Sequence, residues 1–458
     1  MRVSHMIHAD FDDPNLVSAG GLVPTMALAQ RAGLSQLAAE HLTVAGSAGA
    51  NAHVKVPALV AGMVAGADSI EDMDLLRHGA MDRLFVGLRA PTTLGTHLRA
   101  YTFGHVRQLD AIASRLLAGL ADHAPILLGG DQVAYLDIDD TIRRTYGYHK
   151  QGAAYGYNKT KGLNALIATI CTPLAAPVIT AIRLRRGNVA SSHGAPHLIG
   201  EGLATARRAG ASGSITVRAD SANYNHDVVA AARAGDAHFS ITARMDPAIT
   251  AAISRIPEEA WVGIKYPQAI WEESEQRWIS DAEVAETPYV AFTSRRKAEH
   301  VECRLVVRRV KRLQPNSPDG STQEELLPAW RYHAFITNST LSTIEADQRH
   351  REHAIIEQVI AELKDGPLAH LPSGSYAANA AWAALATTAF NIARAAAAAA
   401  AMSTARWATL RRCIISVPAR IASRARHLVL HLPEQWPWQN AWTSLWETAT
   451  GPPVPAVS

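Results

Sequence analysis

The sequence predicts an α/β protein with a mixed sheet and flanking helices, interrupted by a β-rich insertion and preceded by a helical N-terminal domain. Three observations support this prediction. Short apolar runs begin at residue 126 and then alternate with helical patterns, as in a mixed α/β sheet. Before residue 100, apolar residues recur at helical spacing. Residues 256–335 combine tryptophans, charged turns and a basic strand pattern, which indicates a β-rich insertion.

The composition is that of an ordinary globular protein. The chain has 458 residues, of which 48% are hydrophobic and 19% charged, so it can bury more than one core. A formal net charge of +3 does not by itself indicate a nucleic-acid partner. The three cysteines lack CxxC or finger spacing, which argues against structural zinc and favours a reducing compartment. Because the N-terminus MRVSHMIHADFDDP lacks the apolar core of an export signal, we expect a cytoplasmic protein.

Helices are expected at both ends of the chain. GLVPTMALAQRAGLSQLAAEHL has helical spacing broken by Gly33, which fits either a helix-turn-helix corner or a plain helical hairpin. A helical connector follows from residue 101 to about 130. The alanine-rich stretch at residues 377–402 is interrupted by Asn379, Asn391 and Arg394, so we expect a helix there and no membrane span.

The sequence patterns in the central part of the chain predict strands. PILLGGDQVAYLDIDDT, GLNALIATICT and PVITAIRLRRGN are neighbouring strand patterns, and GSITVRADS and AHFSITAR follow them. EGLATARRAG and NHDVVAAARAG between the later strands are helical. In the insertion, the strand pattern ECRLVVRRVKRLQ is strongly basic. Residues 367–433 contain seven arginines and no Asp or Glu, so positive charge is concentrated near the C-terminal end.

Two acids end apolar strand patterns. In QVAYLDIDD, alternation puts Asp137 and Asp139 on one face of the strand, and Asp220 is the first acid after the run GSITVRA. Each could simply begin a turn. A carboxylate at the end of an apolar central strand is costly unless a cation stabilises it, and a divalent metal is the usual solution. Together with Glu357, the strand-end acids Asp139 and Asp220 form the set of three carboxylates that two Mg²⁺ ions require for in-line phosphoryl chemistry.

Glu357 belongs to a polar stripe. QRHREHAIIEQVIAELKDG places His350, His353, Glu357 and Lys364 at spacings of three, four and seven, which is one face of an α-helix. A zinc site is disfavoured, because neither HExxH nor HxxEH is present and the outer ligands would lie ~10.5 Å apart. The plain reading is a solvated helix face, which leaves the other acids unexplained.

These blocks resemble the DDE transposases of bacterial insertion sequences. The resemblance rests on YLDIDDT and GYNKTKGLNALIAT around the first acid, VRADS around the second, and WRYHAFITN and HREHAIIEQVIAELKDGPLAHLPSG around the third. It extends over nearly the whole chain and implies an RNase H-like core, in which one large group of the family inserts a β-rich subdomain before the Glu. The gap between Asp220 and Glu357 is long enough for that insertion.

Carried over by position, the resemblance implies Asp139, Asp220 and Glu357 as the catalytic, metal-binding acids. The group's last helix carries Y-x2-R-x3-E-x6-K. Glu357 and Lys364 match this signature, whereas His350 stands at the Tyr position and His353 at the Arg position. Arg351 is close enough in sequence to substitute for the missing arginine.

The resemblance implies a cut-and-paste transposase that uses two Mg²⁺ ions, with Mn²⁺ as a substitute. Its partners would be double-stranded DNA, as inverted-repeat ends and target, and a second copy of the chain in a homodimeric synaptic complex. We expect it in the bacterial cytoplasm, associated with the nucleoid, and not in a membrane. Two rival hypotheses are a catalytically decayed DNA-binding regulator and a metal-dependent DNA nuclease.

DNA contacts are expected from basic residues beside these acids. RRTYGYHKQGAAYGYNKTKG interleaves cations with tyrosines, a pattern suited to phosphates and displaced bases, although a solvated loop would look similar. The predicted DNA-binding residues are Lys150, Lys159, Lys161, Arg308, Arg309, His350, Arg351, His353 and Lys364.

The predicted domain organisation follows from these segments. It comprises a helical DNA-binding domain (1–100), a helical connector (101–130), the first part of the catalytic core (131–255), the β-rich insertion (256–335), the last part of the core with the Glu-bearing helix (336–402) and a basic C-terminal segment (403–458).

Overall fold

The computed structural model describes residues 7–146, 149–267, 269–273, 277–311, 330–424 and 427–451. Tyr148 of the predicted DNA-binding loop, Arg312 of the basic strand and Arg426 of the acid-free segment lie outside these ranges. The chain divides into two compact units. A helical unit comprises Met1–Ile126, Arg143–Ala153 and Ala361–Ser458, and a sheet unit comprises Leu127–Ile142 and Ala154–Ile360.

The helical unit joins the two ends of the chain, so its bounds differ from the predicted segments 1–100 and 403–458. Its long central helix α13 packs against α7, α4 and α1. Its elements are β1 (Leu16–Val17), α1 (Leu22–Arg31), α2 (Leu34–His41), α3 (Gly46–Gly49), α4 (Ala52–Ala65), α5 (Met81–Leu84), α6 (Pro91–Arg99), α7 (Phe103–Ala121), α13 (Tyr376–Ala399), α14 (Trp407–Leu410), β14 (Ala419–Arg424), β15 (His427–His431) and α15 (Gln439–Thr450). Whether residues 1–100 bind DNA stays a prediction.

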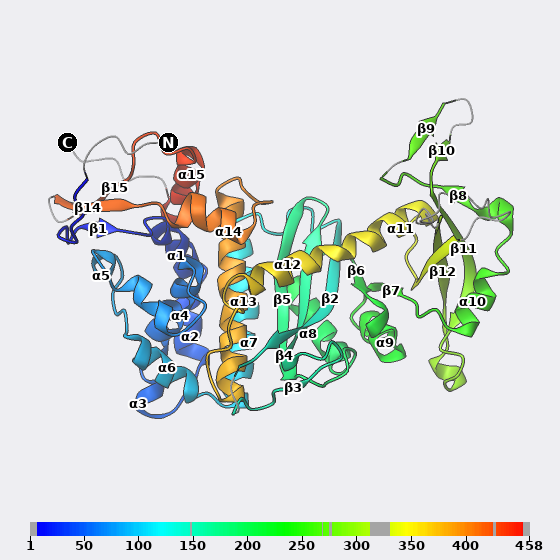
Figure 1. Cartoon of the computed structure of the whole chain (residues 1–458), viewed down its shortest axis with the longest axis horizontal. Helices are drawn as coiled ribbons and strands as arrows, with labels where there is room; N and C mark the ends of the chain where they lie inside the picture. The colour runs from blue at the N-terminus through cyan, green and yellow to red at the C-terminus, as the bar shows by residue number, and fades with distance from the viewer. Residues whose placement is uncertain are drawn as a thin grey trace, which may run out of the picture. The chain divides into compact units, whose positions relative to one another are not determined.

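The alanine-rich segment is the core helix of this unit (Figure 1). Nearly every residue of α13 is buried, and the small alanine side chains allow neighbouring helices to approach closely on all sides. Arg394 and Glu362, both 6% exposed, form an ion pair of 2.7 Å. Between α1 and α2, Gly33 has φ of 93°, a left-handed conformation that favours glycine. No helix in the described part of the chain is long and apolar enough to cross a membrane.

The sheet unit contains the strands and helices that the sequence predicted between residues 126 and 245. Its elements are β2 (Val133–Arg144), β3 (Ala154–Tyr155), β4 (Lys161–Thr172), β5 (Ala175–Arg186), α8 (Ala195–Arg208), β6 (Ser214–Ala219), α9 (His226–Ala234), β7 (His238–Thr242), α10 (Pro247–Ile253), β8 (Val262–Gly263), β9 (Ile270–Glu272), β10 (Arg277–Ile279), β11 (Ala282–Ala291), β12 (Val301–Lys311), β13 (Trp330–Thr337), α11 (Thr343–Arg351) and α12 (Ile355–Lys364), the last continuing into the helical unit.

A mixed ten-stranded sheet organises this unit. Its order is β3-β4-β2-β6-β7-β13-β12-β11-β8, with β5 paired to β4. Strands β2, β6 and β7 are parallel, whereas β4 and β5 form an antiparallel pair. The segment β5-β4-β2-β6-β7 with its helices has the RNase H-like arrangement, so the predicted fold class is confirmed.

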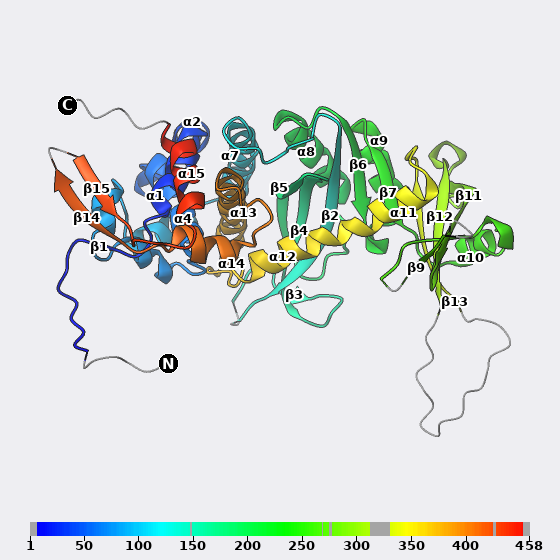
Figure 2. The same ribbon diagram turned by 90° about the horizontal axis from the view of Figure 1, so that it is seen from above.

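Different helices cover the two faces of the sheet. Helices α8 and α9 cover one face, and α11 and the start of α12 lie on the other (Figure 2). A Cβ on Gly202 of α8 would meet Leu136 of β2 at 3.0 Å, so Leu136 points to the α8 side. Because side chains alternate along a strand, Asp137 and Asp139 point to the face with α11 and α12.

The β-rich insertion continues the core sheet. Strand β13 pairs antiparallel with β7, where Ile336 lies opposite Ile241, and β12, β11 and β8 follow outward. The insertion therefore shares its hydrogen-bond ladder with the strands that position the acids. Sequence patterns predicted a β-rich insertion with one basic strand but not this continuity, because pairing partners depend on register.

The sequence predicted that the polar stripe lies on one uninterrupted α-helix, but the structure divides it between two helices. Helix α11 ends at Arg351, a 3₁₀ turn spans Glu352–Ala354, and α12 begins at Ile355. A 3₁₀ turn is tighter than an α-helix, so His350 and His353 are placed differently relative to Glu357 than ideal helical spacing implies.

Candidate active site

Two of the predicted catalytic acids follow from the register of neighbouring parallel strands. In the ladder between β2 and β6, Ile138 lies opposite Ala219. Continued by one residue, this register brings Asp139 beside Asp220, which directly follows β6. Adjacent strands are ~4.8 Å apart, so the two carboxylates leave the sheet as neighbours.

Glu357 completes the acid cluster from α12. Burial raises the pKa of Asp139 to about 7, against the opposing backbone hydrogen bond from Asp140, and the negative charges of Asp220, Asp140 and Glu357 raise it further. The influence of Glu357 on Asp139 means that the helix-borne acid lies near the strand-borne pair. The three predicted catalytic residues therefore gather in one region of the sheet unit.

The carboxylate oxygens of this cluster are only partly used by the protein. One oxygen of Asp139 accepts the backbone N–H of Asp140 at 2.7 Å, and one oxygen of Asp220 accepts the Asn223 amide at 3.1 Å. The other oxygen of each aspartate accepts no hydrogen bond from the described residues, and exposed Glu357 accepts none there either. Free carboxylate oxygens of this kind are the ligands that Mg²⁺ prefers.

Donor chemistry and charge both fit a divalent cation. Three carboxylates without an ion-pair partner among the described residues concentrate negative charge that a cation would neutralise. Within the same residues, no group of three His, Cys, Asp or Glu is arranged closely enough to hold one ion. This holds for Asp139, Asp220 and Glu357 as well as for the zinc alternative of His350, His353 and Glu357.

Asp137, on the same face of β2, is already neutralised. Arg218, opposite it on β6, donates Nε–H to Asp137 Oδ1 at 2.6 Å and an NH2 hydrogen to Oδ2 at 2.8 Å, and both side chains are 1% exposed. Burial alone would lower the pKa of Arg218, but Asp137 outweighs it and raises that pKa. Arg218 also donates to the carbonyl of Arg349 at 2.5 Å and lies 4.3 Å from the Tyr135 ring.

This ion pair therefore connects the strands to the helix that precedes Glu357. Arg349 lies in the last turn of α11, immediately before the 3₁₀ turn. The guanidinium satisfies a carbonyl that the end of an α-helix leaves without a partner. Arg218 thus holds the helix break that sets where α12 begins.

Asp140 points to the face of the sheet that α8 and α9 cover, where its hydrogen bonds hold β2 in place. It accepts hydrogen bonds from Asn164 of β4 and from Arg185 of β5, the latter at 2.8 Å. Arg185 also donates to the carbonyl of Ser191 at 2.9 Å. The network fixes the backbone of β2 beside Asp139. Sequence patterns did not identify Arg185, Asn164 or Arg218, because only strand register shows which charges meet.

His350 is placed inside the protein. Its Nδ1 contacts the Ser240 hydroxyl at 2.8 Å, its Nε2 contacts the Thr242 hydroxyl at 3.0 Å, and its ring stacks on Phe335 with centroids 4.0 Å apart. Burial and then the positive charge of His353, Arg218 and Arg308 hold the pKa of His350 well below its usual range. The predicted DNA contact by His350 finds no support in this arrangement.

His353 and Lys364 lie on either side of Glu357. The half-buried His353 donates Nδ1–H to the His350 carbonyl, which leaves Nε2 as the nitrogen that can meet another group. Lys364 is the last residue of α12 and is half-buried. Their DNA contacts stay predictions.

The predicted cations of the insertion are paired within the protein. Arg309, 6% exposed at its side chain, bonds to Glu283 at 2.6 Å and to Glu258 at 2.8 Å. Its guanidinium lies 4.3 Å from the Trp261 ring and 4.4 Å from the Trp330 ring. Such a stacked, doubly paired arginine stabilises the insertion, and its charge is already used.

A second cluster in this region shares one carboxylate. Arg308 and Arg351 both pair with Asp347, at 3.0 and 2.9 Å, and the Asp347 side chain is only 2% exposed. These two arginines outnumber their acid, so the cluster keeps one net positive charge close to the helix break. The sequence did not reveal these pairs.

The predicted DNA-binding loop is divided between protein contacts and exposed groups. Lys150 bonds to the carbonyl of Leu371 in the helical unit, and burial lowers its pKa. Lys159 and Lys161 are exposed at the hairpin between β3 and β4. Tyr157, 75% exposed, has a pKa raised by partial burial and by Asp140, Asp139 and Asp220. Its ring therefore lies near the acid cluster.

An acid cluster on an RNase H-like sheet is typical of enzymes that cut and join nucleic acid strands. A comparison with protein families matches residues 2–449 to the family described as Transposase DDE domain group 1, and the chain belongs to this family. The resemblance to insertion-sequence transposases is confirmed. A comparison with curated proteins gives no match. Family membership makes this a transposase-type enzyme whose partner is DNA.

Proposed function

We propose that this protein is a cut-and-paste transposase of an insertion sequence, acting on terminal inverted repeats as a homodimer. It would cleave the element's ends and join the freed 3′-hydroxyl to target DNA. The observation that carries the proposal is the gathering of Asp139, Asp220 and Glu357 in a region where negative charge has no protein partner. Structural acids are normally paired with cations, as Asp137 and Asp140 are here.

Asp139, Asp220 and Glu357 would hold two Mg²⁺ ions, or Mn²⁺ in their place. When bound, such ions supply activation of the attacking oxygen and stabilisation of the leaving oxygen in phosphoryl transfer.

The chain's other residues would position these acids and the DNA. The Asp137–Arg218 pair and the Asp140–Arg185 pair hold β2 on both of its faces. Exposed Lys159 and Lys161 would bind phosphates beside the acids, and Tyr157 would stack on a nearby base. His353 and Lys364, before and after Glu357, would contact phosphates flanking the scissile one.

The test is cleavage of a labelled DNA duplex carrying the inverted repeat that flanks the gene. Wild-type protein should cut it with Mg²⁺ or Mn²⁺ but not with a chelator, and Asp220→Asn should bind without cutting. Binding without cleavage by the wild-type protein under every condition would favour the decayed regulator. Cleavage without preference for the repeat, and without joining of the 3′-hydroxyl, would favour a nuclease.

A further inference from the structure

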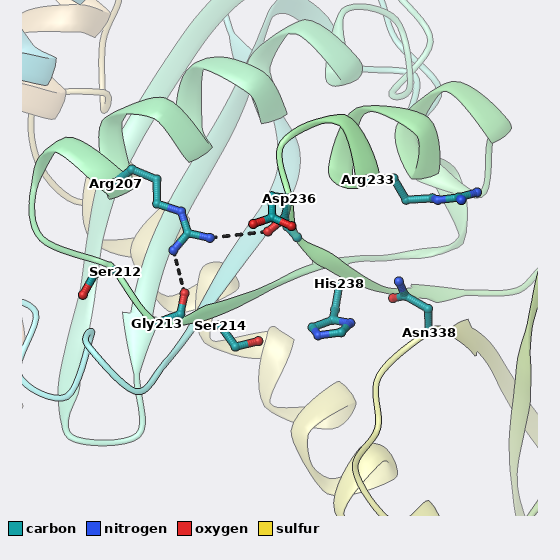
Figure 3. A pocket seen from close by; sticks show the side chains of 9 residues that line it. Arg207, Ser212, Gly213, Ser214, Arg233, Asp236, His238 and Asn338 are labelled. Carbon is teal, nitrogen blue, oxygen red and sulfur yellow. Dashed lines mark hydrogen bonds between the residues drawn. The ribbon is translucent and has the colours of Figure 1, made fainter.

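The sheet unit has a polar pocket at the edge where β6 and β7 begin (Figure 3). Its volume is about 740 Å³, and its walls come from the end of α8, the end of α9, the starts of both strands and the residue after β13. Arg207, Arg233, Asp236, His238 and Asn338 line it. Neither the acid cluster nor the predicted DNA-binding loop contributes to this pocket.

Arg207 brings a positive charge that no carboxylate of the described residues neutralises. Its NH1 donates to the carbonyl of Ala211 at 2.8 Å. NH1 also donates to the carbonyl of Gly213 at 2.6 Å, and NH2 donates to the carbonyl of Asp236 at 3.4 Å (Figure 3). Carbonyl oxygens orient a guanidinium without cancelling its charge. Among the described residues Arg207 forms no ion pair, so a fixed cation is presented at the wall of the pocket.

Two further polar groups at the pocket have no hydrogen-bond partner in the part of the chain that the structure describes. The Nδ1 atom of His238 is buried and has no hydrogen-bond partner among the described residues, which is costly for a polar atom. Asn338 accepts the backbone N–H of Phe239 with its Oδ1 at 2.8 Å, so its amide orientation is fixed. Its NH₂ group has no partner in the described chain and is left as a donor.

The charge balance of the pocket favours an anion. Arg233 is exposed at the end of α9 and forms no ion pair with any residue that the structure describes. The one carboxylate in the lining, on Asp236, is also exposed and belongs to the rim. Two arginines, an amide donor and a histidine against one acid are suited to a compact anion with several acceptor oxygens, such as a phosphate group.

The pocket is distinct from the active site. It lies where β6 starts at Ser214, whereas Asp220 follows the other end of the same strand. Six residues of strand at ~3.3 Å each separate them by roughly 20 Å. A phosphate at the acid cluster therefore cannot also occupy this pocket.

We propose that this pocket is a second phosphate-binding site, held by Arg207, Arg233 and the amide of Asn338. The phosphate group in this pocket can belong to the DNA backbone or to a free phosphate compound. The assignment to DNA rests on the proposed function, whereas the binding of a phosphate group does not.

The experiment compares wild-type protein with three variants. Arg233→Gln removes an exposed charge that has no described partner. Asn338→Asp keeps the oxygen that accepts the Phe239 N–H but replaces the amide donor by a negative charge. Arg208→Gln is the matched control, because Arg208 is the exposed neighbour of Arg207 on α8 and does not line the pocket.

The first measurement is the thermal stabilisation by pyrophosphate at constant ionic strength and without divalent metal. At 100 times the dissociation constant, a site-bound ligand stabilises the folded state by about 2.7 kcal/mol. We expect pyrophosphate to raise the Tm of wild type and of Arg208→Gln by the same amount. The increase should be less than half as large for Arg233→Gln and absent for Asn338→Asp. Equal increases in all four proteins, or no increase in wild type, would overturn the proposal that this pocket binds phosphate groups.

The second measurement is the salt dependence of binding to a plain duplex that carries no inverted repeat. A DNA backbone source predicts that Arg233→Gln lowers the slope of log K against log salt by about 0.9, while Arg208→Gln leaves it unchanged. An unchanged slope together with lost pyrophosphate stabilisation would assign the site to free phosphate compounds. No difference between Arg233→Gln and the control in either measurement would refute the site.

Cleavage at the element's end separates this proposal from the proposed function. Arg233→Gln should still cut a pre-nicked end, since the pocket lies far from the acids. Loss of pyrophosphate binding with normal cleavage would support both proposals. Normal cleavage without any pocket effect would remove this site alone.

Discussion

Strand β2 carries two aspartates on one face, two residues apart, in opposite electrostatic environments. Asp137 is 1% exposed and doubly bonded to Arg218, so its charge is cancelled where it forms. Asp139 lies beside Asp220 and Glu357, and burial together with these acids raises its pKa to about 7. The sequence LDID gives no sign of this difference. A paired carboxylate holds a structure together, whereas an unpaired group of carboxylates is suited to bind cations.

The largest expected effect comes from the unpaired acids. Asp220→Asn and Glu357→Gln keep the side-chain shape but remove charge that would hold metal, so end cleavage should fall by roughly 10³-fold or more. Binding to the element's end should change less than threefold. Single-turnover cleavage and a gel-shift titration measure the two quantities, and near wild-type cleavage by either variant would remove that residue from the site.

Breaking the Asp137–Arg218 ion pair should instead lower the free energy of unfolding. Arg218→Met leaves Asp137 buried without its cation, and removing one member of a buried pair costs about 3–5 kcal/mol of unfolding free energy. The measurement is urea unfolding followed by tryptophan fluorescence. In the double variant Arg218→Met, Asp137→Leu, much of that loss should return, because no buried charge remains. A loss below about 1 kcal/mol in Arg218→Met would show that the pair does not stabilise the sheet.

His350 extends the comparison to a buried group that must stay neutral. Because burial lowers its pKa in the folded state, the unfolded chain takes up a proton at about pH 6.5 that the folded chain does not. Its contribution to stability is therefore complete above pH 7 and falls as pH drops below 6.5, by up to about 1.4 kcal/mol per pH unit.

The variant His350→Phe isolates this contribution. It keeps the stacking on Phe335 but leaves the Ser240 and Thr242 hydroxyls without the imidazole. We expect it to be less stable at pH 7.5, with a difference from wild type that shrinks towards pH 5. The same difference at both pH values in urea unfolding would mean that His350 titrates normally in the folded protein.

The smallest expected effect is a change in the salt dependence of DNA binding, which should differ between exposed cations and cations in ion pairs. Lys159→Gln and Lys161→Gln should each lower the salt slope of DNA binding by roughly 0.9, because exposed lysines release counterions from phosphates. Arg309→Gln should leave the slope within ~0.3 and lower stability instead, since its charge is paired with Glu258 and Glu283. A slope change for Arg309 equal to that of the lysines would show that its ion pairs open on DNA.

The sequence predicted the fold class, the strands of the core and the alanine-rich helix. Apolar periodicity carries this information, because each element must bury one face. It did not predict that the insertion continues the sheet through β13 and β7, or that the two chain ends share a unit. Both depend on contacts between residues far apart in the sequence, which no local pattern encodes.

Candidate acids could be identified from strand ends and from resemblance, but their partners could not. Arg218 stands two residues before Asp220, and only the register of β2 against β6 shows that it neutralises Asp137. The charges of Arg308 and Arg309 look free in a basic strand pattern, yet each is paired with an acid. The pattern of charges therefore did not reveal which cations have acidic partners.

The most direct test of the account is single-turnover cleavage of a pre-nicked element end by Asp139→Asn and Asp137→Asn, in Mg²⁺ and at a temperature where circular dichroism shows both proteins folded. We predict that Asp139→Asn loses roughly 10³-fold or more in rate, while Asp137→Asn cleaves within ~10-fold of wild type and unfolds at a lower temperature. An active Asp139→Asn beside a folded but inactive Asp137→Asn would contradict it, because the paired aspartate would then be the metal ligand.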